Sequence, residues 1–273
     1  MHFGIDVAQQ RLDWDELASR VVLAEELGFA GAWGFDHYQP MYGTGPGSCF
    51  EGMTTLAALT GMTRQIRLGL LVTGITYRHP SVLAAEVVTI DHASHGRLEL
   101  GLGAAWFEPE HVALGVDFPS TRLRFDLLED ALEAMTRLFT GERVSYAGRR
   151  LRLEGAQLLP VPVQQPHPPI WIGGTGRRRT LPLAAPFADA WHAFGTPRSL
   201  APLSARLDRL TSEAGRDPSN IRRAASLSLS EPLDDIRRRV DGWQEAGWDY
   251  LVCGWPTEGR GRVEEFAAAL LGG

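Results

Sequence analysis

Lysine is absent from this chain of 273 residues, so all 27 basic residues are arginine. Schiff-base mechanisms use a lysine amine as the nucleophile, and the sequence therefore excludes lysine-dependent aldolases and pyridoxal phosphate enzymes. Cysteine is also scarce, because Cys49 and Cys253 are the only two and provide no disulfide framework. A GC-rich genome is a simpler source of the arginine bias itself.

Excess positive charge and long apolar runs are missing as well. The formal net charge is -6 and the sequence pI is about 5.8, so no basic surface is expected to offset repulsion from phosphates. We therefore expect no nucleic-acid partner. Neither end resembles a signal peptide and no apolar run is long enough to span a bilayer, which predicts no membrane partner and a soluble cytoplasmic protein.

The composition that is present fits one large globular core. The chain is 44% hydrophobic and 22% charged, and no Pro/Gly/Ser linker or block of like charge divides it. We therefore expect a single domain over residues 1–273.

Residues 66–106 predict a strand, a helix and a second strand joined by short loops. The run 66–73 is almost continuously apolar, as in a strand buried on both faces. Pro80 suits the first position of a helix, apolar residues follow at helical spacing, and Gly96 ends the segment before the next strand at 97–101. This is the pattern of a parallel crossover unit.

Eight such strand and helix pairs fit along the chain, which predicts an α/β fold, the (β/α)8 TIM barrel. That barrel takes about 250 residues, so little is left for another domain. A weakly alternating stretch at 144–159 with a turn at Gly148 predicts a small hairpin insertion before strand five. The expected strands are 3–6, 30–35, 66–73, 97–101, 170–172, 188–194, 224–229 and 250–253. Helices are expected at 51–62, 123–139, 202–214, 232–246 and 261–271, among others.

The active site of such a barrel lies at the carboxyl ends of its strands, and Asp36 and His37 directly follow the second strand. A histidine beside an aspartate can exchange a proton near neutral pH, which makes both residues catalytic candidates. A histidine that only caps a loop is the alternative.

The loop after strand five, Gly173, Gly174, Thr175 and Gly176, offers backbone amides to an anion. The arginines at 177–179 would lie in the first turn of the next helix, where a bound phosphate would offset their conflict with the helix dipole. We expect a cofactor phosphate here. An ordinary tight turn is the alternative.

Other residues fall on loops at the same end of the barrel. Gly74 and Ile75 interrupt a buried strand, where a bulge or an unusual peptide would push backbone into the pocket. Glycines at 101 and 103 would let another molecule approach the backbone closely. Residues expected to line a substrate cleft are Trp106, His79, Met41 and Glu108, although each residue type is often a cap or a surface group. No histidine spacing indicates a metal site.

Four ordered motifs, at 31–37, 73–80, 96–106 and 168–176, resemble the bacterial-luciferase-like flavin and deazaflavin oxidoreductases. The similarity is to the branch that uses the deazaflavin coenzyme F420, and it runs from about residue 3 to the last helix. The resemblance implies a luciferase-like TIM barrel in which a non-prolyl cis peptide after strand three supports the ring system. Gly74-Ile75 occupies that place in this sequence.

The resemblance also implies site roles. His37 would exchange a proton with the substrate as hydride moves, and Asp36 would contact the ring system or fix His37. The cofactor F420 would be held by Asp36, Thr73, Gly74, Ile75, Gly103, Gly173, Gly174, Thr175, Gly176 and Arg177. Members of the family often form homodimers, so a homodimer is also expected.

Two departures from the family pattern bear on the reaction. The alcohol and sugar-phosphate dehydrogenases of the family carry a tryptophan and a carboxylate where this chain has Met41 and Ala104. We therefore expect a reductase or a natural-product tailoring oxidoreductase acting on a small organic substrate. An FMN-dependent monooxygenase and a flavin-binding protein without catalysis remain alternatives.

Overall fold

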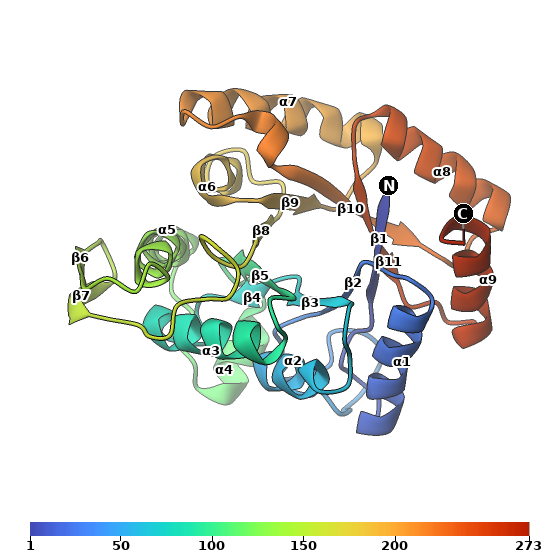
Figure 1. Ribbon diagram of the computed structural model, residues 1–273, viewed down its shortest axis with the longest axis horizontal. Helices are drawn as coiled ribbons and strands as arrows, with labels where there is room; N and C mark the ends of the chain where they lie inside the picture. The colour runs from blue at the N-terminus through green and yellow to red at the C-terminus, as the bar shows by residue number, and fades with distance from the viewer. Residues whose placement is uncertain (273) are drawn as a thin grey trace.

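The computed structural model describes residues 1–272, which form a closed parallel barrel with helices around it (Figure 1). Pairing of β3 with β5 and of β1 with β11 closes the ring, and β4 (Thr73–Gly74) extends the third strand position by pairing with β5. The predicted TIM barrel is confirmed. Its strands, in order around the ring, are β1 (His2–Asp6), β2 (Gly31–Gly34), β3 (Arg67–Leu70), β5 (Leu98–Gly103), β8 (Ile170–Gly173), β9 (Ala190–Ala193), β10 (Arg222–Ser228) and β11 (Tyr250–Gly254).

The helices lie around the barrel, as Figure 1 shows. Asp13 caps the first of them by accepting a hydrogen bond from the amide of Glu16 at 2.8 Å. The helices after the strands are α1 (Trp14–Glu26), α2 (Gly52–Thr60), α3 (Pro80–Ala93), α5 (Thr121–Leu138), α6 (Thr180–Phe187), α7 (Pro197–Glu213), α8 (Leu233–Glu245) and α9 (Arg260–Leu270). Two short helices, α4 (Glu108–Leu114) and the 3-10 turn η1 (Pro218–Asn220), lie in loops.

One helix boundary differs clearly from the prediction. Helix α7 begins at Pro197, where the sequence predicted a start at Pro202. Thr196 and Ser199 form a capping box that starts the helix earlier, and Pro202 is tolerated inside it. A proline inside a helical pattern usually marks a helix boundary, so the predicted start lies further along the chain than the observed one.

The predicted hairpin is present as β6 (Val144–Ala147) paired antiparallel with β7 (Arg152–Ala156). The buried carboxylate of Asp130 on α5 holds it, because it accepts from the hydroxyl of Tyr146 at 2.9 Å and the amide of Leu151 at 3.0 Å. The insertion therefore rests on the outside of the barrel, away from the ends of the strands.

Large aromatic side chains fill the barrel interior. The rings of Trp33 and Trp171 lie 4.4 Å apart, and the indole of Trp33 donates a hydrogen bond to the hydroxyl of Tyr250 at 3.1 Å. A Cβ atom on Gly4 or Gly69 would lie 2.5 Å from the Trp33 ring, so only glycine leaves room for it there. The interior is therefore a packed core and not a channel.

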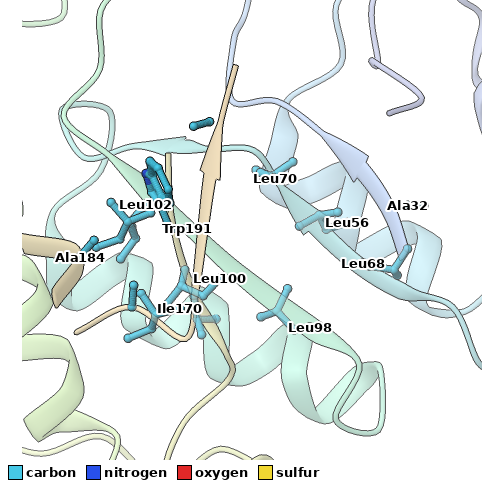
Figure 2. Packing of buried hydrophobic residues seen from close by; sticks show 14 of the residues in the cluster. Ala32, Leu56, Leu68, Leu70, Leu98, Leu100, Leu102, Ile170, Ala184 and Trp191 are labelled. Carbon is cyan, nitrogen blue, oxygen red and sulfur yellow. The ribbon is translucent and has the colours of Figure 1, made fainter. Parts of the chain in front are cut away.

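A second apolar layer separates the strands from the helices. Leu68, Leu98, Leu100 and Ile170 point outward from β3, β5 and β8 and are buried under the surrounding helices (Figure 2). With packing on both faces, the strands provide a rigid frame for the residues that follow them.

Candidate active site

A cavity of about 430 Å³ opens at the carboxyl end of the barrel. Its walls come from residues 35–37 after β2, the segment between β3 and β4, residues 103–106 after β5, and the ends of β8 and β9. We call it the main cavity. A second cavity of about 330 Å³ lies beside it over the ends of β1, β10 and β11. Leu71, His192 and Phe194 line both cavities, so the two lie side by side.

The segment between β3 and β4 forms one wall of the main cavity. A non-prolyl cis peptide joins Leu71 and Val72, and both residues line the cavity. The sequence predicted an unusual peptide here but placed it at Gly74-Ile75, which is wrong. Gly74 instead pairs with Gly103 in the parallel sheet, so the chain has already rejoined the barrel at that point.

The strand-end glycines are explained by contacts within the chain. A Cβ atom on Gly103 would lie 2.6 Å from Cγ2 of Val72, and one on Gly101 would lie 1.9 Å from the carbonyl oxygen of Leu70. A Cβ on Gly173 would also contact Val72, at 3.3 Å. Residues 70–72 therefore pack closely against these glycines from within the protein. These contacts explain why glycine is needed at the three positions without a bound molecule.

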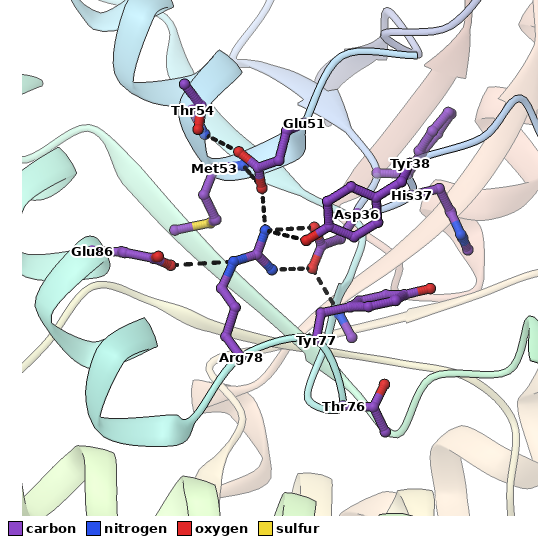
Figure 3. A network of polar contacts seen from close by, with 12 residues as sticks. Asp36, His37, Tyr38, Glu51, Met53, Thr54, Thr76, Tyr77, Arg78 and Glu86 are labelled. Atoms are coloured by element: carbon purple, nitrogen blue, oxygen red, sulfur yellow. Dashed lines mark hydrogen bonds and ion pairs between the residues drawn. The ribbon is translucent and has the colours of Figure 1, made fainter. Parts of the chain in front are cut away.

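Asp36 is buried and belongs to an ion network centred on Arg78 (Figure 3). Its carboxylate accepts two hydrogen bonds from the guanidinium of Arg78, at 2.6 and 3.0 Å, and one from the amide of Gly74 at 3.2 Å. Glu51 and Glu86 complete the network around Arg78. Asp36 lines the main cavity, and its side chain makes no hydrogen bond to the His37 ring, whose Nδ1 atom faces Glu110 instead. Of the two roles expected for Asp36, contact with the ring system stays a prediction.

Burial and charge oppose each other in this network. Burial raises the pKa of the Asp36 carboxyl above its ordinary value, while the hydrogen bonds and charge of Arg78 pull the pKa down. Burial also opposes the charge of Arg78, but its partners outweigh burial and raise the pKa of the guanidinium. Arg78 therefore stays charged and holds Asp36 in place.

His37 is oriented by a residue that the sequence analysis missed. Its Nδ1 atom lies 3.1 Å from Oε2 of Glu110, a fully buried residue of α4. The same carboxylate accepts hydrogen bonds from the amides of Tyr38 and Gln39 and from the hydroxyl of Tyr77. His37 itself lines the main cavity.

The glycine loop after β8 differs in detail from the predicted anion site. Helix α6 begins only at Thr180, so the arginines at 177–179 lie in the turn before it and not in its first turn. The amide of Gly174 donates to the carbonyl of His192 at 2.9 Å and is not free for a phosphate. Gly174 also has a φ of +116°, which only glycine adopts readily.

What remains of the predicted anion site lies beyond Gly174. Thr175, Gly176, Arg177 and Arg178 are exposed on the loop. Arg179 is bound elsewhere, because its guanidinium pairs with Asp126 at 3.1 Å.

The four residues predicted to line a substrate cleft lie in different places in the structure. Trp106 lines the main cavity with its side chain 67% exposed, and its ring centroid is 6.0 Å from that of His37. His79 caps α3 by accepting from the amide of Ser81 at 3.2 Å, which is the alternative noted for it. Glu108 is exposed at the start of α4, and Met41 lies in the loop after β2. Within residues 1–272, neither cavity is lined by these last three residues.

The predicted cofactor residues divide in a similar way. Gly74, Gly103, Gly173 and Gly174 line the main cavity together with Asp36, whereas Thr73 and Ile75 are buried behind its wall. Cavity residues that the sequence analysis did not identify include Tyr77, Arg124, Phe125, His192 and Phe194. They come from the loop after β4, from helix α5 and from the end of β9.

The second cavity has polar groups set among mostly apolar walls, and no arginine lines it among the residues described, 1–272. Burial lowers the pKa of His192 to about 4, so its ring is neutral at pH 7, and its Nε2 atom lies 3.1 Å from the hydroxyl of Ser226. Burial raises the pKa of Asp6 to about 6, against a hydrogen bond from the amide of Ala8. Serines 228 and 230 add further hydroxyl groups.

Two further observations concern residues 1–272 as a whole. No helix among them combines the length and the apolar character needed to cross a bilayer. No group of three or more His, Cys, Asp or Glu side chains among them is placed to hold a metal ion.

The ion network leads to a prediction about stability. Arg78→Met leaves the buried Asp36 carboxylate without its cation, and we expect the free energy of unfolding to fall by about 4 kcal/mol. Combining it with Asp36→Asn should cost less than the sum of the single changes, because both charges then leave together. Chemical denaturation of the four proteins in this cycle measures both effects, and additive losses would show that the two residues are not coupled.

The chain is 31% identical over 225 residues to the F420-dependent hydroxymycolic acid dehydrogenase of Mycobacterium tuberculosis, covering 82% of this chain and 61% of that protein. It is 33% identical to the F420-dependent glucose-6-phosphate dehydrogenase of Microbacterium testaceum, over 70% of this chain and 56% of the relative. The chain thus spans less than two thirds of either relative.

The fold is also similar to that of a solved F420-dependent secondary alcohol dehydrogenase in complex with an F420-acetone adduct. The TM-score is 0.87 at 18% identity, and the match covers 99% of this chain and 98% of the other. The sequence profile of the family described as luciferase-like monooxygenase matches residues 1–252. This chain therefore belongs to the luciferase-like monooxygenase family.

Proposed function

We propose that this protein is an F420-dependent oxidoreductase that transfers hydride between the deazaflavin and a small, uncharged organic substrate. The observation that carries the proposal is the main cavity, which places His37 and the glycine-lined ends of β4, β5 and β8 around one space. The F420-dependent relatives support this choice of cofactor.

The residues of the main cavity fit a flat ring with an anionic tail. Gly103, Gly173 and Gly174 line it without side chains, so its wall there is backbone and the Val72 side chain. Beyond Gly174 the loop exposes Arg177 and Arg178, which can pair with a phosphate or a carboxylate tail. In this proposal the glycines hold the ring system and the loop holds the phosphate.

The protein's own chemical contribution is the movement of a proton at His37. When bound, the deazaflavin supplies or accepts the hydride. His37 exchanges the matching proton with the substrate, and Trp106 beside it limits access of water to that exchange. The frame of packed strands keeps these groups at fixed positions.

The second cavity supports an uncharged substrate. Its polar groups are hydroxyls, the carboxyl of Asp6 and the neutral ring of His192, and within residues 1–272 no arginine lines it. A phosphate-bearing substrate would find no counter-charge there. Met41 and Ala104, which replace two residues of the family's dehydrogenases, further favour reduction of an activated double bond or imine over alcohol oxidation.

Two expectations go beyond a single chain: the homodimer and the cytoplasmic location both stay predictions.

A binding titration tests the choice of cofactor. We expect the purified protein to bind F420 at least tenfold more tightly than FMN, because the exposed arginines can also pair with the longer acidic tail of F420. Quenching of cofactor fluorescence measures both affinities. Tighter binding of FMN would instead favour a luciferase-type monooxygenase.

Arginine variants test whether Arg177 and Arg178 bind the anionic tail of F420. Replacing Arg177 and Arg178 together by glutamine should weaken F420 binding by about tenfold, the scale of one or two lost charge-assisted contacts. Arg143→Gln, an exposed arginine of the hairpin insertion, is the matched control and should leave binding unchanged. Equal losses in both proteins would place the anionic tail elsewhere.

A second prediction concerns His37. His37→Ala should slow turnover by about a hundredfold or more while F420 affinity stays within a few fold, because general acid and base assistance is lost but the cavity wall is kept. Anaerobic single-turnover kinetics with reduced F420 and a panel of enones and imines measures the rate. An unchanged rate would remove His37 from the mechanism, and no turnover of any compound by the unaltered protein would favour a non-catalytic flavin-binding protein.

A further inference from the structure

The orientation of His37 depends on one carboxylate from a short helix of the loop after β5. Glu110 lies in α4, is completely buried, and reaches back to the segment that follows β2. Phe35, Trp106 and Phe107 surround the His37 ring with edge-on contacts, at centroid distances of 5.4, 6.0 and 5.9 Å. These apolar neighbours confine the ring but do not select between its two nitrogen atoms.

Every acceptor position of Glu110 is occupied by a donor. Oε1 accepts from the amides of Tyr38 and Gln39 at 2.7 and 2.8 Å, and Oε2 faces Nδ1 of His37 at 3.1 Å and the hydroxyl of Tyr77. A carboxylate has about four lone-pair positions and no hydrogen of its own when ionised. Glu110 can therefore satisfy all four groups only if each of them donates.

The charge state of Glu110 agrees with this pattern. Burial alone would raise the pKa of its carboxyl, but the hydrogen bonds from His37, Tyr77 and the two amides outweigh burial and lower the pKa below the ordinary value. Burial and the nearby carboxylate raise the pKa of Tyr77, so its hydroxyl keeps its proton and acts as a donor. Two of the four acceptor positions of Glu110 are occupied by backbone amides, which can only donate.

We propose that Glu110 is the positioning residue of the reaction: it fixes the hydrogen of the His37 ring on Nδ1 and leaves Nε2 as the nitrogen that exchanges a proton with the substrate. Nε2 has no hydrogen-bond partner among residues 1–272, and the His37 ring lines the main cavity. The proton moves between Nε2 and the substrate atom, while the Nδ1 hydrogen stays on the ring throughout. The assignment of the ring hydrogen to Nδ1 rests on the contacts of Glu110. Only its kinetic consequence rests on the proposed function.

The end of β5 provides no carboxylate of its own to the cavity. Ala104 directly follows this strand and provides no acid or base. Glu110 brings a carboxylate to His37 from the next helix, where it can orient the ring but is kept from the cavity. In this chain a single histidine then performs the proton exchange, and the carboxylate acts only through it.

The tautomer of His37 tests the inference directly in the free protein. Heteronuclear NMR of protein with isotope-labelled histidine reports which ring nitrogen carries the hydrogen, with His37 assigned by its loss in His37→Gln. We expect the His37 ring of the unaltered protein to carry hydrogen on Nδ1, facing Glu110. A ring with hydrogen mainly on Nε2 would overturn the proposal, whether or not the protein binds F420.

Glu110→Gln provides the kinetic test. We expect the tautomer preference to reverse and the rate of hydride transfer to fall by about a hundredfold, because the amide group that replaces the carboxylate oxygen facing His37 donates to Nδ1 and nearly all rings then carry their hydrogen on Nε2. The KM and the F420 affinity should stay within a few fold, since Glu110 touches neither ligand. An unchanged rate, or an equal loss in KM and affinity, would reduce Glu110 to a structural role.

Two variants keep the test valid if Glu110→Gln folds poorly. Tyr77→Phe removes one donor from Glu110 but keeps its charge, so His37 should retain its Nδ1 hydrogen, and a switch to Nε2 would contradict the assignment. Glu154→Gln removes an exposed carboxylate of the hairpin and should change neither tautomer nor rate. If F420 is not the cofactor but His37 carries the Nδ1 hydrogen, the proposed function fails and the positioning role stands.

Discussion

The buried ion pair between Asp36 and Arg78 fixes the position of the catalytic end of the barrel. Asp36 follows β2, Arg78 follows β4, and the same carboxylate also binds the amide of Gly74, so one side chain joins the ends of two neighbouring strands. His37 is the next residue after Asp36, and Val72 lies just before β4. One interaction therefore places the backbone at His37, for which we propose proton exchange, and the wall of the cavity.

The second carboxylate of the site completes this arrangement from the other side. Glu110 binds the backbone of residues 38 and 39 and the ring of His37, so the loop after β2 is held by α4 as well as by Arg78. Two buried acids thus act through different partners: Asp36 sets where the loop begins, and Glu110 sets how the histidine ring faces. Neither acid has to react for the site to function.

Sequence patterns were sufficient for the fold and for the strand ends that form the site. Parallel crossovers, glycine stops and capping residues are local signals, and they placed Asp36, His37 and Gly173 at the same end of the barrel. They failed where the outcome depends on distant contacts. Glu108 and Glu110 lie in the same short segment, and only packing makes the first exposed and the second buried.

The position of the cis peptide and the role of His79 show the same limit. Leu71 and Val72 bulge because Thr73 and Gly74 pair again with β5, a non-local register that no local pattern reveals. The position of His79 on a loop after a strand predicts a substrate contact. In the structure its ring instead accepts a hydrogen bond from the amide of Ser81 and caps α3. His192 enters the site from the end of β9, because β9 pairs with β8 and places His192 opposite Gly173.

The central claim is that the main cavity holds a deazaflavin beside His37. A crystal structure of the protein with F420 bound tests it most directly. We expect electron density for the ring in the space bounded by Val72, Gly103 and His37, with the phosphate on the loop at Thr175 and Gly176. Density for the ring outside this cavity, or a cavity that stays empty at saturating F420, would contradict the account.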